Sequence, residues 1–286
     1  MKKIINKGII IFSSVLLLAP TLQTHAYAET VSPEEAFSEE LAEENLELVD
    51  SELAIDESGE ELYILTVETE TGDSIDLKLN MDSNDITVEA LSDVTGEIEK
   101  YSISLPEDAE ITGEDTYTEE LEDITVENEI TGDVYEYEDL EGEFSGALAI
   151  PSAIPIVWSA LVSLYNSGLA IVAAGATFIV AGHAISKIMN NKNKKNHYLA
   201  TIVKGKLYIG KGVSDSAAVT QLRSGKSTWS ISSNQAKNIA SKLAKGSPIK
   251  EVDKDTKGNP KKGYYWHWHS STRNPKGHHA FYGYPV

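Results

Sequence analysis

The chain of 286 residues contains no cysteine. This absence excludes disulfides, thiolate metal ligands and lipid attachment to cysteine, so the fold must depend on core packing. Charge is also scarce in two places. Residues 29–145 contain only two basic side chains, and residues 144–186 contain no Asp, Glu, Lys or Arg. The chain therefore consists of segments with different physical character.

The charged residues that are present separate by sign along the chain. Residues 29–145 hold 41 acidic and two basic residues, a net charge of −39. Residues 187–286 hold 19 basic and four acidic residues, a net charge of +15. A segment with this positive balance attracts polyanions such as nucleic acid. Because the two regions are opposite in charge, we expect the acidic region to mask the basic region.

Residues 1–28 predict a secretory signal peptide. Three lysines precede an apolar run from Gly8 to Ala19, and Ala26 and Ala28 occupy the positions that signal peptidase reads. An uncleaved N-terminal anchor is the alternative, although the apolar run is shorter than the ~20 residues of a membrane span. We therefore expect a secreted, extracellular protein.

Residues 29–145 predict an acidic β-rich domain. A helix can begin after Ser32, and from about Leu62 apolar and polar residues alternate with a period of two. The sequence Thr-Gly-Asp or Thr-Gly-Glu recurs at 71–73, 95–97, 112–114 and 131–133, as the hairpin turns of a meander would. An elongated acidic spacer is the alternative.

Residues 146–187 predict a hydrophobic helical hairpin. Its two apolar stretches are Ile150 to Tyr165 and Leu169 to Ile185, and the second is rich in small residues that allow close helix–helix approach in a bilayer. We predict that this segment contacts or crosses a target-cell membrane. A permanent transmembrane helix and a hairpin buried in a soluble core are the alternatives.

Residues 188–286 predict a small basic α+β domain. Short strands surround Gly205, while Ser214 and one of Ser232 and Ser233 can cap two helices. A later strand is expected over Tyr264 to His269.

Four of the chain's seven histidines lie near its C-terminal end, where alternation along the Tyr264–His269 strand separates them from tryptophans. His267 and His269 share one face, and Trp266 and Trp268 the other. This pattern predicts core tryptophans and histidines that point to solvent or a cleft. The candidate catalytic residues are His267, His269, Arg273, His278 and His279.

Metal-free cleavage of RNA fits this set of residues. RNA carries its own nucleophile, so one histidine can take the 2′-hydroxyl proton while another protonates the leaving oxygen, and Arg273 can grip the phosphate. Few carboxylates are available, which argues against a two-metal site; a single zinc site is the alternative. We expect no cofactor.

Three further residues are candidate substrate contacts. Lys211 follows Gly210 in a P-loop-like run that we interpret as a strand, and it can contact phosphate near the helix start at Ser214; an ordinary strand–turn–helix is the alternative. Lys276 adds positive charge beside the histidines, and Tyr282 can stack on an unpaired base.

The runs HYLATIVKGKLYIGKG at 197–212 and YYWHWHSSTRNPKGHHAFYGYP at 264–285 resemble a family of secreted toxins of Gram-positive bacteria. The arrangement of a signal peptide, a variable acidic region and an Ala/Gly-rich hydrophobic segment before a His-rich toxin domain is similar to that of polymorphic toxins. The resemblance covers about 197–286, and it implies toxicity and a neutralising immunity protein. A barnase-like or colicin-RNase-like fold is an expectation by analogy.

We therefore expect a secreted toxin of interbacterial competition whose basic C-terminal domain acts on nucleic acid as a metal-independent ribonuclease. Its partners would be RNA, a cognate immunity protein and a target-cell membrane contacted by residues 146–187. A membrane-active toxin and a non-enzymatic cell-surface binding protein are the alternatives.

Overall fold

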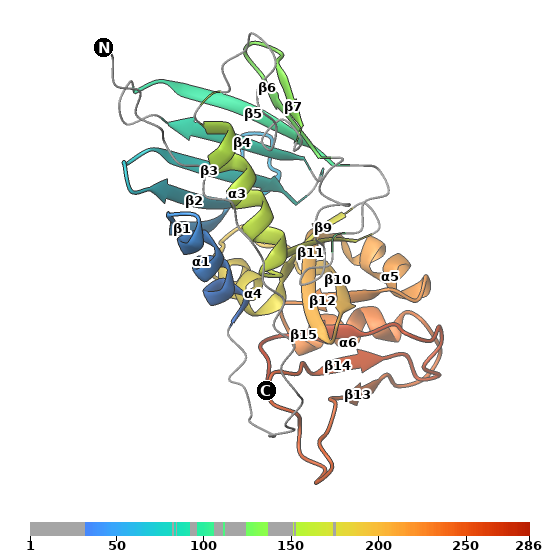
Figure 1. Ribbon diagram of the computed structural model, residues 1–286. Coiled ribbons are helices and arrows are strands. Elements are labelled where there is room, and N and C mark those ends of the chain that lie inside the picture. The colour runs from blue at the N-terminus through green and yellow to red at the C-terminus, as the bar shows by residue number, and fades with distance from the viewer. Residues whose placement is uncertain are drawn as a thin grey trace, which may run out of the picture. The chain divides into compact units, whose positions relative to one another are not determined.

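Two β-sheets and five short helices account for the regular structure of the described residues (Figure 1). The computed structural model describes residues 32–81, 83, 85–91, 96–105, 111, 124–136, 151, 153–173 and 176–286, which belong to one unit, Ser32–Val286. The predicted signal peptide at 1–28 and the predicted turn at 112–114 lie outside the described residues.

The first sheet is a meander in which each strand pairs antiparallel with the next. Its strands are β1 (Leu46–Ile55), β2 (Glu61–Thr69), β3 (Ser74–Asn80), β4 (Ile86–Leu91), β5 (Ile98–Ser104), β6 (Thr125–Asn128) and β7 (Val134–Glu136). Alternate side chains such as Leu65, Leu77 and Val88 are fully buried, so one face is apolar while the acidic residues remain toward solvent. Gly72 supplies a φ of +90° in the turn between β2 and β3.

Two helices cover part of this sheet. α1 (Pro33–Glu43) starts with a capping box formed by Ser32 and Glu35, and it buries Phe37 and Leu41 against β1. α3 (Ala153–Asn166) contacts α1 and β3. Figure 1 shows α3 running across the strands of the first sheet.

The predicted fold class is wrong, and the hydrophobic segment is the principal reason. The described residues contain no hydrophobic helical hairpin: after α3 the chain forms the strands β8 (Ala170–Ala173) and β9 (Ala176–Val180) and the helix α4 (Ala181–Asn190). Nor is the C-terminal region a small α+β domain with its own sheet, because β8 and β9 extend its sheet to eight strands. The fold is an α+β mixture that is rich in strands.

Residue type explains why the second apolar stretch forms strands. β-branched side chains such as Ile171, Val172 and Ile179 favour an extended backbone, and these three are buried. A fully buried strand has no polar alternation, so its sequence resembles that of a buried helix. Within the described ranges, no helix is both long enough and apolar enough to span a membrane.

The second sheet has the order β13-β14-β15-β12-β10-β11-β9-β8. Its remaining strands are β10 (His197–Val203), β11 (Lys206–Val213), β12 (Ser227–Ser230), β13 (Ile249–Glu251), β14 (His267–His269) and β15 (Ala280–Tyr282). Every strand pair is antiparallel except β12–β15, which is parallel. β15 therefore joins β13 and β14 to the rest of the sheet.

Helices α5 (Asp215–Arg223) and α6 (Ser233–Ser241) pack on one face of this sheet. Ser214 caps α5 and Ser232 caps α6, which confirms the two predicted helix starts. Leu222 and Ile239 meet Ala280 of β15 in a small apolar cluster beneath the helices. The face that bears Phe281 belongs instead to the main hydrophobic core.

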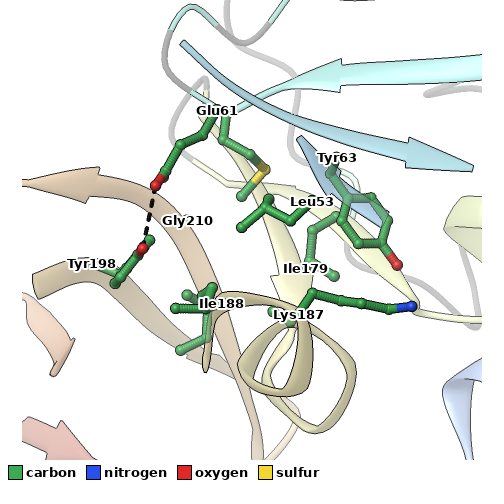
Figure 2. Close-up of a pocket in the computed structure, with 11 residues that line it drawn as sticks. Leu53, Glu61, Tyr63, Ile179, Lys187, Ile188, Tyr198 and Gly210 are labelled. Atoms are coloured by element: carbon green, nitrogen blue, oxygen red, sulfur yellow. Dashed lines mark hydrogen bonds between the residues drawn. The ribbon is translucent and has the colours of Figure 1, made fainter. Parts of the chain in front are cut away.

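Residues of the acidic region contact the second half of the chain directly. The Tyr198 hydroxyl donates to the Glu61 carboxylate at 3.2 Å, although Glu61 is only 1% exposed. Figure 2 shows this pair at the pocket where β1 and β2 meet α4, β10 and β11. The Lys187 amine donates to the Ser51 carbonyl. The acidic and basic segments are therefore connected by hydrogen bonds, in addition to being opposite in charge.

Candidate functional site

Three histidines come together on β14 and at the start of β15. His267 and His269 are two residues apart on β14, so they share a face of the sheet. β14 pairs antiparallel with β15, with His267 opposite Phe281, and His279 directly precedes β15. Pairing of these two strands therefore brings the His279 ring to the same face.

The three imidazoles pack edge to face. The ring centroids are 5.0 Å apart for His267 and His269, 4.9 Å for His267 and His279, and 4.8 Å for His269 and His279. Phe281 closes one side, stacked on His279 at 5.1 Å. The side chain of His269 is 12% exposed and His267 is 5% exposed, so the cluster is largely shielded from water.

The prediction of core tryptophans and outward histidines is wrong, although the separation of faces is correct. Tyr265 and His267 are buried, whereas Trp266 and Trp268 are half-buried. Trp268 lies under α6, where its indole N–H donates to the Ser233 hydroxyl at 3.2 Å. The histidine face is the more buried because it continues into the main core, while short α6 covers the other face only in part.

Each histidine of the cluster has a polar partner at one ring nitrogen. Nδ1 of His267 lies 3.1 Å from the Tyr265 carbonyl, which can only accept, so Nδ1 carries the proton and Nε2 is left with a lone pair. Nδ1 of His279 lies 3.4 Å from the Ser227 hydroxyl, and Nε2 of His269 lies 3.5 Å from the Glu251 carboxylate. The cluster is therefore oriented by groups around it.

Glu251 is the functional candidate that the sequence analysis missed. It occupies the end of β13, opposite His267, and its carboxylate accepts both terminal N–H groups of Arg273. The scarcity of acids was a signal, because Glu251 is one of only four acidic residues in the basic half of the chain. Register across two strand pairs was needed to place it beside the histidines.

Arg273 forms a bidentate ion pair with Glu251, and this use of its guanidinium differs from the phosphate grip that was expected. The ion pair lowers the pKa of the Glu251 carboxyl and raises that of the guanidinium. Arg273 also has a φ of +54°, which is uncommon for a residue with a side chain and often marks a functional loop. The ion pair with Glu251 places the Arg273 guanidinium at the edge of the histidine cluster.

Burial lowers the pKa of all three imidazoles. Desolvation is the largest cause for each, and repulsion by neighbouring histidines adds to it for His269 and His279, whose pKa values fall to about 4. The three rings are therefore neutral at neutral pH in the free protein. Neutral imidazoles can accept a proton or donate a lone pair to a metal ion.

The structure gives His278 a positional role. It is fully buried, its Nε2 accepts the Ser270 backbone N–H at 3.0 Å, and its Nδ1 donates to the Pro275 carbonyl. Both ring nitrogens are thus engaged with the loop that carries Arg273. His278 packs 5.2 Å from His269 and supports it from behind.

The three predicted substrate contacts are not brought together with the cluster. Lys211 lies on β11, three strands from β15 in the sheet order, which corresponds to roughly 14 Å. Tyr282 points to the opposite face from Phe281 and has the Lys250 amine 5.8 Å from its ring. Lys276 is exposed in the loop before His278 and remains available to a polyanion.

The glycines beside Lys211 serve packing. A Cβ at Gly210 would lie 2.8 Å from the Phe178 ring, and one at Gly212 would lie 2.8 Å from the Glu61 carboxylate. Both positions lie within β11, so the P-loop-like run is a strand, as the sequence indicated.

His197 forms a separate constellation with a serine and an aspartate. Its Nδ1 lies 2.8 Å from the Ser230 hydroxyl and its Nε2 lies 3.3 Å from the Asp215 carboxylate. Ser230 is completely buried, so its hydroxyl is closed to a substrate. We interpret this group as a structural link between β10, β12 and α5.

Exposed lysines are concentrated in the loop that leads into the histidine strand. The loop between β13 and β14 carries four of them, at Lys254, Lys257, Lys261 and Lys262. This loop joins the strands of Glu251 and His267, so it begins and ends at the candidate site. Such a rim suits a polyanionic ligand.

Comparisons with protein-family models, with curated proteins and with solved structures return no match to this chain.

Proposed function

We propose that the chain is an exported bacterial toxin whose basic C-terminal region cleaves RNA at the cluster of His267, His269 and His279. The observation that carries this proposal is the convergence of three neutral imidazoles on one sheet face, beside a carboxylate and within a region of strongly positive charge. No other described group combines proton acceptors with a polyanion-binding rim.

His269 is the proposed general base. It takes the proton of an RNA 2′-hydroxyl, and the 2′-oxygen then attacks the adjacent phosphorus. Glu251, 3.5 Å from Nε2 of His269, stabilises the imidazolium that forms. Arg273 holds Glu251 in place, which makes the arginine a positioning residue in this proposal.

A second imidazole of the cluster, His279, is the proposed general acid. As the P–O5′ bond breaks, its imidazolium protonates the 5′-oxygen, leaving a 2′,3′-cyclic phosphate and a 5′-hydroxyl. Burial and neighbouring histidines lower the pKa of His279, but the negative charge of a bound phosphodiester has the opposite effect. Substrate binding therefore favours the protonated form that the second step needs.

The toxin setting supplies the remaining partners of this proposal. The predicted signal peptide exports the chain, and a producing cell protects itself with an immunity protein that binds the basic region. Membrane contact by a helical hairpin is not part of the proposal, because the described part of residues 146–187 is folded into the core.

The test is incubation of the purified chain with single-stranded RNA in EDTA, followed by analysis of the product ends. We expect cleavage that leaves cyclic phosphates. DNA of the same sequence should remain intact because it lacks the 2′-hydroxyl. Intact RNA, or equal cleavage of DNA, would refute the mechanism.

Two variants locate the activity. His269→Ala should lower the cleavage rate by about 10²- to 10⁴-fold, the usual contribution of a general base. His183→Asn is the matched control, because it removes a buried histidine that lies outside the cluster. Equal cleavage rates for the two variants would show that cleavage does not take place at the histidine cluster.

A further inference from the structure

The three histidines of the cluster have the arrangement of a transition-metal site. One ring nitrogen from each of His267, His269 and His279 lies within 4.8 Å of the others. Tetrahedral zinc with Zn–N bonds of about 2.0–2.1 Å requires ligand nitrogens about 3.4 Å apart. Binding of an ion would draw these nitrogens together by up to about 1.4 Å through rotation of the rings.

The groups around the cluster match those that orient metal-binding histidines. Such a histidine commonly directs its second ring nitrogen to a carbonyl, a hydroxyl or a carboxylate, which fixes the ring and its tautomer. Here Tyr265 supplies a carbonyl to His267, Ser227 a hydroxyl to His279 and Glu251 a carboxylate to His269. All three histidines therefore have a polar partner at a ring nitrogen, as metal-binding histidines commonly do.

The choice of ion follows from the ligands. Imidazole nitrogens favour zinc, copper, nickel and related first-row ions, whereas magnesium and calcium require several oxygen ligands. Glu251 is the carboxylate in contact with the cluster, and Arg273 neutralises it, while Asp253 interacts electrostatically with His267 and His279. A thiolate ligand is excluded, since the chain has no cysteine.

We propose that His267, His269 and His279 bind one Zn²⁺ or a similar first-row transition-metal ion, and that the bound ion inhibits the ribonuclease reaction. Inhibition follows because the ion occupies the lone pairs that would otherwise accept the 2′-hydroxyl proton. The binding part stands on the geometry alone, while the inhibitory part rests on the proposed function.

Binding is tested on the full chain after removal of metal with a chelator. We expect ZnCl₂ to bind with a stoichiometry of one by competition against a chromophoric zinc indicator, and MgCl₂ not to compete. His269→Ala and His279→Ala should each weaken zinc binding by at least about 100-fold, since loss of outer partners alone costs about 10- to 100-fold. His183→Asn should bind as the parent does.

A second measurement uses the unaltered chain, so it does not depend on the folding of variants. Co²⁺ bound by three imidazoles should give visible absorption bands of a four- or five-coordinate ion, and one equivalent of Zn²⁺ should remove them. A spectrum of hexaaqua cobalt, or binding unchanged in His269→Ala, would overturn the site.

RNA cleavage is then followed at each step of the zinc titration. Loss of cleavage in proportion to zinc occupancy, reversed by EDTA, supports inhibition. Cleavage that appears only with zinc would overturn the inhibitory role while leaving the site intact. If RNA stays intact with and without zinc, the proposed function fails, and the binding data still decide the site.

Discussion

Shortening one side chain in α3 tests whether the hydrophobic segment belongs to the core. Val157 is fully buried in α3, whereas Val162 of the same helix is only partly buried. We expect Val157→Ala to destabilise the fold clearly and Val162→Ala to have a much smaller effect. The substitution is chemically identical at both positions, so burial is what differs.

The size of the effect follows from the buried methyl groups. Removing the equivalent of two CH₂ groups costs about 1.6 kcal/mol in transfer free energy, at about 0.8 kcal/mol each. A residual cavity of about 30 Å³ adds about 0.7 kcal/mol, at about 24 cal/mol per Å³. Val157→Ala should therefore lower the free energy of unfolding by about 2 kcal/mol and Tm by about 4–8 °C for a unit of this size.

Urea unfolding followed by circular dichroism measures this difference at constant slope against denaturant. A helix made for insertion into a bilayer would give a different result, because its apolar side chains would not stabilise the water-soluble fold. Equal midpoints for the parent, Val157→Ala and Val162→Ala would refute the placement of α3 in the core.

Three further predictions concern pH, a buried histidine and salt. Burial lowers the pKa of His183, whose Nδ1 lies 2.9 Å from Glu34, with Tyr63 and Lys187 nearby. The unfolded chain therefore binds a proton that the folded chain does not, so stability should fall as pH drops through about 6.5, and His183→Asn should flatten this dependence in urea unfolding. His278→Ala should cost about 2 kcal/mol by leaving the buried Ser270 N–H without an acceptor, as measured by the urea midpoint. RNA affinity should fall with salt, and Lys276→Gln should reduce the log–log slope by about 0.7, measured by fluorescence anisotropy.

Matched comparisons decide these three predictions. The raised pKa of Glu40 acts in the opposite direction on the pH dependence, but it is common to the parent and His183→Asn and cancels in their difference. An equal loss of stability in His278→Ala and His269→Ala would contradict the role of the His278 hydrogen bonds. An unchanged salt slope would remove Lys276 from the RNA contact surface.

Local signals in the sequence were sufficient for turns and helix starts. Gly72, Gly96 and Gly132 have φ values of +90°, +68° and +74° at three of the expected turns, and Ser214 and Ser232 cap the expected helices. These features depend on one or two residues and their immediate neighbours, so the sequence contains the information directly.

The sequence did not show which apolar segments form strands or which face of a strand is buried. Leu169 to Val180 has a single polar side chain, Thr177, and periodicity then cannot distinguish a buried strand from a buried helix. Alternation separated His267 from Trp268 correctly, but which face meets the core depends on the size of α6. Glu251 lies beside the histidines because β13 pairs with β14, and the sequence did not reveal this pairing.

The position of β15 makes the histidine cluster depend on pairing between segments that are far apart in the sequence. β15 is paired with β12 on one side and β14 on the other, so among the described strands it is the one that links β13 and β14 to the rest of the second sheet. Without β15, the hairpin that carries His267 and His269 would have no strand joining it to β12, and His279 would not be placed beside it. A chain that is unfolded, or held partly folded, carries all three side chains but not the site. We expect such a chain to lack the proposed cleavage activity.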